Sequence, residues 1–297
     1  VQGTAAYIDD MREPDGLLHV YPGYARDGSV GKISKLDLDK VRATPGVVAV
    51  LTAKDIPGVN DSSPSVGGDP ILAAGAIEFH GQVSCAVVAE TREAARRAAR
   101  LAAIEIAVTT PAVTVDDALA MGTKDVGEPC AFARRNVAAA LKASAGTIEE
   151  SFLIGGQEHF YLEGQVALAI PGEDGEMMIY SSTQHPSEVQ HIVAHVLGLD
   201  QSAVTVEVRR MGGGFGGKCD PANHEMVVAK AALLLGRPVK ICLTREEVFY
   251  QHRGRHPVLM KMRTGVTRDG KLTGMHLQTL LDGGGYGSYG AASTFYT

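Results

Sequence analysis

The sequence is poor in cysteine and has no cysteine pair spaced to bind a metal. Its 297 residues include four cysteines, at positions 85, 130, 219 and 242, and no two of them form a Cys-x-x-Cys pair. Their separations match no zinc-binding pattern. Such sparse use of cysteine is typical of a reducing cytoplasm, where we expect the protein to be located.

Long apolar runs, basic excess and a secretion signal are also missing. The apolar runs, such as Ala231–Leu235, are far shorter than the roughly eighteen residues that a membrane span needs. The net charge of −6 argues against nucleic acid as a partner. At 45% hydrophobic residues the chain can still bury a sizeable core. We therefore expect neither a membrane nor a nucleic-acid partner.

The order of strand-like and helix-like segments predicts an α+β protein with two domains. We expect an α/β domain over residues 1–108, a linker with one short helix over 109–145, and a mixed domain over 146–297. In the first domain, a strand is expected over 83–89, a helix over 92–103 with Thr91 as its N-cap, and a second strand over 104–108. The length of this strand–helix–strand unit predicts a parallel crossover. Further strands are expected at 17–24, 47–51, 104–108, 147–152, 165–170, 177–181, 204–208, 239–243 and 271–281, with those after 146 in one sheet, and further helices at 186–197 and 220–235.

The most informative segment is Gly212–Lys218, which reads Gly-Gly-Gly-Phe-Gly-Gly-Lys. Glycine loses more conformational freedom on folding than any other residue. A run of glycines this dense therefore indicates that something large lies against the bare backbone. A predicted strand precedes the loop and a predicted helix follows it. Backbone N–H groups in such a loop can point at an anionic ligand.

Motifs alone leave several interpretations of this loop open. Gly212, Gly214 and Gly217 satisfy the dinucleotide fingerprint, which would make the protein an NAD-dependent dehydrogenase, although the acids at Glu246 and Glu247 come late for that motif. The loop nearly satisfies the phosphate-binding motif of nucleotide hydrolases, but Cys219 replaces the Ser or Thr that holds magnesium. A tight turn without ligand is the remaining alternative.

Two long motifs resemble one known family. Met211–Lys218 and Gly155–Glu163 together are similar to the molybdenum-cofactor subunit of the xanthine dehydrogenase and aldehyde oxidase family. The segments 181–186 and 253–257 fit the same family, and stretches between Val1 and Ala89 resemble its N-terminal hammerhead domain. The resemblance covers essentially the whole chain. It implies an α/β hammerhead domain followed by an incomplete α+β molybdenum-cofactor-binding domain.

The resemblance also assigns site residues. It places Gln157 beside an oxo ligand of molybdenum as a neutral hydrogen-bond donor, with the catalytic role, and implies that the N–H groups of Phe215 and Gly216 meet the metal's oxygen ligand. Gln157 and Phe215 would thus surround the metal without ligating it directly. The full set that the resemblance implies for cofactor binding is Gly156, Gln157, Gly214, Phe215, Gly216 and Gly217.

The substrate stays open at this point. The resemblance places Cys219 in the substrate pocket, at the position where xanthine-oxidising members of the family usually carry Glu. A thiol is a weaker hydrogen-bonding group than a carboxyl. Xanthine or hypoxanthine is the leading expectation. The alternatives within the family are an aldehyde, an aromatic N-heterocycle or 4-hydroxybenzoyl-CoA.

The resemblance further implies cofactors and partners. These are molybdenum-molybdopterin, with or without a cytosine nucleotide, and [2Fe-2S] and FAD groups on partner subunits or domains. The family's catalytic Glu would lie beyond Thr297, so we expect this chain to be the N-terminal part of its subunit and inactive without the C-terminal part. A cofactor-binding or assembly module without catalysis is an alternative of another class.

Overall fold

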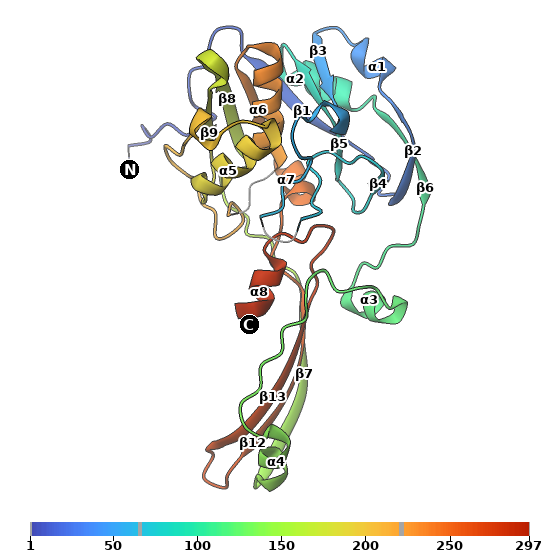
Figure 1. Ribbon diagram of the computed structural model, residues 1–297, viewed down its shortest axis with the longest axis vertical. Helices are drawn as coiled ribbons and strands as arrows, with labels where there is room; N and C mark the ends of the chain where they lie inside the picture. Colours follow the sequence, from blue (N-terminus) through green and yellow to red (C-terminus); the bar gives the residue numbers. More distant parts are fainter. Residues whose placement is uncertain (1, 65–66, 220–222, 297) are drawn as a thin grey trace. The chain divides into compact units, whose positions relative to one another are not determined.

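The computed structural model describes residues 2–64, 67–219 and 223–296 (Figure 1). The chain divides into two compact units, each made of two stretches of sequence. Unit 1 comprises Val1–Pro111 and His159–Arg253, and unit 2 comprises Ala112–Glu158 and Gly254–Thr297. The units are defined by contacts in space, and along the sequence their stretches alternate between unit 1 and unit 2. The boundaries expected at residues 108 and 145 therefore stay a prediction.

Unit 1 contains most of the secondary structure. Its strands are β1 (Leu18–Tyr24), β2 (Gly31–Asp37), β3 (Val47–Leu51), β4 (Ala76–Ile77), β5 (Val83–Ala89), β6 (Ala103–Val108), β8 (Val166–Pro171), β9 (Met177–Ser181), β10 (Val204–Glu207) and β11 (Val239–Cys242). Its helices are α1 (Asp39–Arg42), α2 (Arg92–Ala99), α5 (Pro186–Leu197), α6 (Asn223–Leu235) and α7 (Arg245–Gln251), with short 3-10 turns at Ala53–Asp55, Glu173–Gly175 and Gln201–Ala203.

The centre of unit 1 is a seven-stranded mixed sheet with the order β10-β9-β8-β11-β1-β5-β3. Strands from the first hundred residues and strands from beyond residue 160 join where β1 pairs with β11 in parallel. The remaining pairs are antiparallel except β9 with β10. One sheet therefore contains strands from both of the domains that the sequence predicts.

Helices cover both faces of this sheet, and β5 shows why. All seven residues of β5 are buried, so alternate side chains enter two different cores. Ala86 and Val88 join the larger core with α5 and α6, while Val87 and Ala89 join the smaller core with the alanines of α2. Thr91 caps α2 by accepting a hydrogen bond from the Ala94 N–H at 3.1 Å, as predicted.

The predicted parallel crossover from 83–89 through the helix to 104–108 is wrong. Strand β5 already has β1 and β3 as antiparallel neighbours, so neither of its edges is free. Helix α2 also ends at Ala99, earlier than expected. The following strand β6 instead pairs with β2 in a separate three-stranded sheet of order β4-β2-β6.

Helix α6 lies after the glycine-rich loop. Asp220 and Pro221, where the sequence predicts its first turn, fall outside the described residues. The helix is described from Asn223 to Leu235, and Gly236 ends it with φ of 59°. That left-handed conformation is one that glycine adopts readily, so the predicted stop signal is confirmed.

Unit 2 is built around a three-stranded antiparallel sheet of order β13-β12-β7. Its elements are α3 (Val115–Met121), α4 (Val137–Ala143), β7 (Gly146–Ile154), β12 (Val258–Val266), β13 (Leu272–Leu281) and α8 (Gly290–Tyr296). The strands expected at 147–152 and 271–281 exist, but they do not continue the large sheet as predicted. The reason is β12, which the sequence reading missed and which pairs with both of them.

The segment expected to be a linker with one helix contains two. Besides α3, helix α4 forms over an alanine-rich stretch, and Asn136 caps it by accepting a hydrogen bond from the Ala139 N–H at 2.9 Å. It packs on β12 and β13 at two glycines. A Cβ at Gly274 would lie 3.2 Å from Ala140 Cβ, and one at Gly265 would lie 3.1 Å from Leu141 Cδ2. Glycine at these positions lets the helix approach the sheet closely.

The helices offer no membrane span. Among the described residues, none of them combines the length and apolar character that crossing a bilayer requires.

The cysteines yield a prediction about thiol reactivity. Cys85 is fully buried in β5, and this burial raises the pKa of its thiol to about 12. Because the thiolate is the reactive species, Cys85 should resist an aromatic disulfide reagent at pH 8 while exposed Cys130 reacts readily. Mass spectrometry of the labelled protein would identify the sites, with Cys130→Ser as control. Fast labelling of Cys85 in the folded protein would contradict the packing described for β5.

Candidate functional site

The glycine-rich loop Gly212–Lys218 follows β10 and precedes α6 in unit 1. Its backbone departs from ordinary geometry at three residues: φ is 96° at Gly213, 53° at Phe215 and 98° at Gly216. A positive φ is uncommon for a residue with a side chain, so the conformation of Phe215 must be imposed by its surroundings.

Most of the other glycines in the loop are required by the protein itself. A Cβ at Gly212 would lie 2.5 Å from Glu163 Cβ, one at Gly214 would lie 2.4 Å from Gln184 Oε1, and one at Gly217 would lie 2.6 Å from Tyr161 Cε1. At these three positions the absence of a side chain is therefore explained without an external ligand. The chain's own side chains take up the space.

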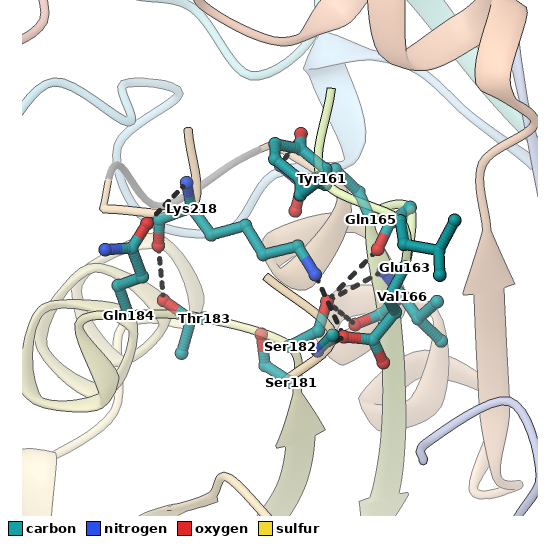
Figure 2. Close-up of polar contacts among 12 residues, drawn as sticks. Tyr161, Glu163, Gln165, Val166, Ser181, Ser182, Thr183, Gln184 and Lys218 are labelled. Atoms are coloured by element: carbon teal, nitrogen blue, oxygen red, sulfur yellow. Dashed lines mark hydrogen bonds and ion pairs between the residues drawn. The ribbon is translucent and has the colours of Figure 1, made fainter. Parts of the chain in front are cut away.

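A buried ion pair holds the two ends of the loop. The ammonium of Lys218 lies 2.9 Å from Glu163 Oε2 (Figure 2). The same oxygen accepts a hydrogen bond from the Gly212 N–H at 2.8 Å. The Lys218 side chain is fully buried. Burial lowers the pKa of the Lys218 ammonium, and the adjacent Glu163 carboxylate acts in the opposite direction. The Tyr161 ring also faces this ammonium, with Nζ 4.8 Å from its centroid.

A side-chain amide holds the middle of the loop. Gln184 Oε1 accepts hydrogen bonds from the Gly216 N–H at 2.9 Å and the Lys218 N–H at 3.2 Å. The Gln184 backbone N–H in turn donates to the Lys218 carbonyl at 2.7 Å, and Thr183 Oγ1 donates to the same carbonyl at 3.2 Å (Figure 2). The loop is thus fixed by hydrogen bonds from side chain and backbone.

A third set of contacts lies beneath Gly217. Gln165 Nε2 donates to the Gly217 carbonyl at 3.1 Å and to the Tyr161 hydroxyl at 2.8 Å. Tyr161 is fully buried, and the Arg245 guanidinium donates to its carbonyl. These contacts tie the loop to the segment that precedes β8.

The arrangement argues against both nucleotide interpretations. The phosphate-binding interpretation needs a lysine that reaches a phosphate, whereas the Lys218 ammonium is buried against Glu163. A dinucleotide fold needs neighbouring parallel strands on either side of the helix. Here β9 and β8 separate β10 from β11, and α6 packs mainly on β8.

The exposed part of the loop is centred on Phe215. This residue is 73% exposed, and within the described part of the chain its N–H donates no hydrogen bond. Gly216 is exposed, Gly214 is buried, and Gly217 and Cys219 are half-buried. Unit 1 therefore brings together five of the predicted site residues, from Gly214 to Cys219.

Gly156 and Gln157 belong to unit 2, where we describe them by themselves. Gln157 forms an isolated bridge with Arg255: its N–H donates to the Arg255 carbonyl at 3.2 Å and its carbonyl accepts from the Arg255 N–H at 2.8 Å. Both residues are exposed, and the Gln157 side-chain amide makes no hydrogen bond to another described residue. The predicted association of Gln157 with the glycine loop stays a prediction.

The sequence reading assigned no role to Glu163, Gln184 or Tyr161, although these side chains determine the loop conformation. The signal was available, because all three lie in segments that carry the family resemblance. What sequence could not supply is the pairing between them: Glu163 and Lys218 are 55 residues apart.

Comparison with known proteins gives a consistent result. The family model described as the molybdopterin cofactor-binding domain matches residues 123–297, and that of the aldehyde oxidase and xanthine dehydrogenase a/b hammerhead domain matches residues 2–109. The chain is 37% identical over 280 residues to a xanthine dehydrogenase of Drosophila subobscura and 38% identical over 285 residues to aldehyde oxidase 2 of Macaca fascicularis. These alignments cover 93% and 95% of this chain and 21% of each relative.

Solved structures agree on the fold. Quinoline 2-oxidoreductase from Pseudomonas putida 86 superposes with a TM-score of 0.82 at 27% identity, over 94% of this chain and 37% of that one. The aldehyde oxidoreductase from Desulfovibrio gigas gives the same TM-score at 26% identity, over 91% of this chain and 31% of that one.

A hammerhead region followed by a molybdopterin cofactor-binding region thus defines the class. The chain belongs to the xanthine dehydrogenase and aldehyde oxidase family, and the α+β prediction is confirmed. It spans 21% of the length of the curated relatives that it matches.

The packing of the loop predicts the effect of one added methyl group. Gly212→Ala should lower the free energy of unfolding by about 1–3 kcal/mol, because its Cβ would overlap Glu163 Cβ and approach the Glu163 backbone. Urea unfolding would measure the change. Gly75→Ala is the matched control, since a Cβ there meets nothing within 4 Å. Equal stability of the two variants would refute the close approach.

Proposed function

We propose that this chain is part of the molybdopterin-binding subunit of a cytoplasmic molybdenum hydroxylase. The observation that carries the proposal is the fixed glycine loop, in which Phe215 is exposed, its N–H has no acceptor among the described residues, and Glu163 compensates the charge of Lys218. The loop thus offers hydrogen-bond donors without a free ionised side chain of its own. The family match over residues 123–297 supports the same conclusion.

The residues present are suited to a metal centre with oxygen ligands. A backbone N–H at Phe215 and a neutral amide at Gln157 can each donate a hydrogen bond without adding charge to the centre. When bound, the molybdenum cofactor supplies the insertion of a water-derived oxygen into a substrate C–H bond and the transfer of two electrons onward. The chain's own contribution is to hold and orient that group. We assign this to Gly156, Gln157, Gly214, Phe215, Gly216 and Gly217.

Gly216 takes a role different from that of Phe215. Its N–H already donates to Gln184, so we assign it the provision of space rather than a hydrogen bond. A Cβ added there would find His159 Nε2 at 3.5 Å as its nearest neighbour, an ordinary contact distance. Within unit 1, Gly216 therefore has room for a Cβ atom, whereas Gly212, Gly214 and Gly217 do not.

Xanthine or hypoxanthine is the substrate that we propose first, because xanthine dehydrogenases of several organisms are among the relatives. Aldehyde oxidases match equally well, so an aldehyde is the second candidate. An aromatic N-heterocycle or 4-hydroxybenzoyl-CoA follows. Half-buried Cys219 favours the alternatives, since a thiol recognises a purine less strongly than a carboxyl would.

The electron acceptors are proposed to lie on other polypeptide segments. Four dispersed cysteines provide no cluster-binding motif in this sequence, so [2Fe-2S] and FAD groups would belong to partner subunits or domains. The remaining C-terminal part of the subunit would supply the catalytic base. The cofactor that we propose is molybdenum-molybdopterin, with or without a cytosine nucleotide.

Elemental analysis of the intact complex tests the proposal. Molybdenum at about one atom per subunit, with oxidation of a purine or aldehyde, would support a hydroxylase. Tight NAD binding without molybdenum would support the dehydrogenase interpretation instead. Bound molybdenum without any oxidation would support an assembly module.

Substitution of Gln157 gives a sharper prediction. In the intact complex, Gln157→Ala should lower kcat by about tenfold or more through loss of one hydrogen-bond donor to the metal's ligand, while the melting temperature stays unchanged because the side chain is exposed. Gln278→Ala removes another exposed amide of unit 2 and serves as control. Turnover of Gln157→Ala equal to that of the control would refute the assigned role.

A further inference from the structure

Two oxygen atoms organise the glycine loop, and each accepts two hydrogen bonds from it. Glu163 Oε2 accepts from the Gly212 N–H and the Lys218 ammonium, which lie at opposite ends of the loop. Gln184 Oε1 accepts from the N–H groups of Gly216 and Lys218. The Glu163 N–H also donates to the Gly212 carbonyl at 3.1 Å, so the contact at that end is reciprocal.

The carboxylate occupies the position that an external anion takes in many glycine-rich loops. Backbone N–H groups in such loops point at a negatively charged ligand. Here the Gly212 N–H points at the carboxylate of Glu163, which belongs to the same chain. Glu163 Oε1 is buried and has no hydrogen-bond partner among the described residues, so Oε2 alone makes both contacts. On the Glu163 side, the contacts to both ends of the loop therefore depend on one oxygen atom.

Resting on the function proposed above, we propose that Glu163, Lys218 and Gln184 are positioning residues that preorganise the loop before the molybdenum cofactor binds. We call these three residues the loop clamp. The loop clamp keeps Phe215 at positive φ with its N–H free of the protein's own acceptors in the described structure. A preformed loop spares the binding of the cofactor the entropy of ordering the loop. The clamp acts through the loop and does not touch the reacting atoms.

Unit 1 contains a second buried lysine that serves as a matched control. Lys240 is 5% exposed, and its ammonium lies 2.7 Å from Asp9 Oδ1. This pair ties the N-terminal segment to β11, and among the described residues no hydrogen bond or ion pair joins it to the glycine loop. Replacing Asp9 and Lys240 by apolar residues removes a lysine–carboxylate pair from unit 1 at a place away from the loop clamp.

The first experiment measures hydrogen exchange in the full-length subunit prepared without molybdenum. Glu163→Leu with Lys218→Met replaces the ion pair by apolar groups of similar size, a change that proteins often tolerate with little loss of stability. We expect the melting temperature to stay close to that of the wild type while amides of residues 212–219 exchange about tenfold faster, because the Gly212 N–H loses its acceptor. Asp9→Leu with Lys240→Met should leave exchange in that peptide unchanged.

Gln184→Leu provides a second route that removes no charge. The side chain is half-buried, so the substitution removes the acceptor of two N–H groups without leaving a buried ion. We expect the same acceleration of exchange in residues 212–219. This variant decides the matter if the double variant at Glu163 and Lys218 does not fold.

The second experiment uses the molybdenum-loaded complex. The loop-clamp variants should change the Mo(V) electron paramagnetic resonance signal and lower kcat with little change in KM, since the altered loop touches the metal's ligand rather than the substrate. If the three residues had a purely structural role, the melting temperature, the Mo(V) signal and kcat would change together. If they position the loop, the double variant should change the Mo(V) signal and kcat while its melting temperature stays close to that of the wild type.

The outcomes distinguish this inference from the proposed function. Loop exchange at the wild-type rate in both loop-clamp variants overturns the inference whatever the complex does. Faster exchange with an unchanged Mo(V) signal and unchanged kcat also overturns it. If exchange is faster in the variants but the wild-type complex contains no molybdenum, the loop clamp still orders the loop. That result would overturn the proposed function and the link between the clamp and the cofactor.

Discussion

The structure of the candidate site depends on a single buried ion pair. Glu163 and Lys218 neutralise each other where the lysine side chain is fully buried and the glutamate side chain is 11% exposed, so an unpaired charge there would be strongly unfavourable. Since the same carboxylate oxygen accepts the Gly212 N–H, charge compensation and loop geometry are coupled. Gln184 adds a neutral acceptor at the centre of the loop. The loop can then adopt positive φ at Phe215, a conformation that it would seldom hold in isolation.

Around this pair, the large sheet provides the rigid frame. The glycine loop leaves edge strand β10, while Glu163 and Gln165 lie just before β8, two strands away in the sheet. Ser181 and Gln184 lie at and after the end of β9, between them. Helix α6 packs across β8, β9 and β11 and fixes the spacing of these ends. The loop therefore rests on three strands rather than on its own short span.

Local patterns predicted most of the individual elements. The signals for strand β5, helix α5 and the cap at Thr91 each come from residues that are close together in the sequence, so each is read directly from a short segment. The pairing of β6 and the course of β12 were missed, because a strand's partner is set by which edges remain available. The exposed lysine and arginine in β12 also weakened its strand pattern. For the site, the sequence identified the loop but not the residues that hold it.

The sequence by itself determined the family, the place of the glycine loop between strand and helix, and the presence of a neutral amide at Gln157. These follow from residue identity over short spans. Only the tertiary structure decided why the loop needs its glycines and what happens to Lys218. Gly212, Gly214 and Gly217 are required by side chains that arrive from distant parts of the chain, and the lysine that sequence would offer to a phosphate is buried against Glu163. Contacts of this kind depend on how the strands are ordered in the sheet, and a one-dimensional pattern does not contain that order.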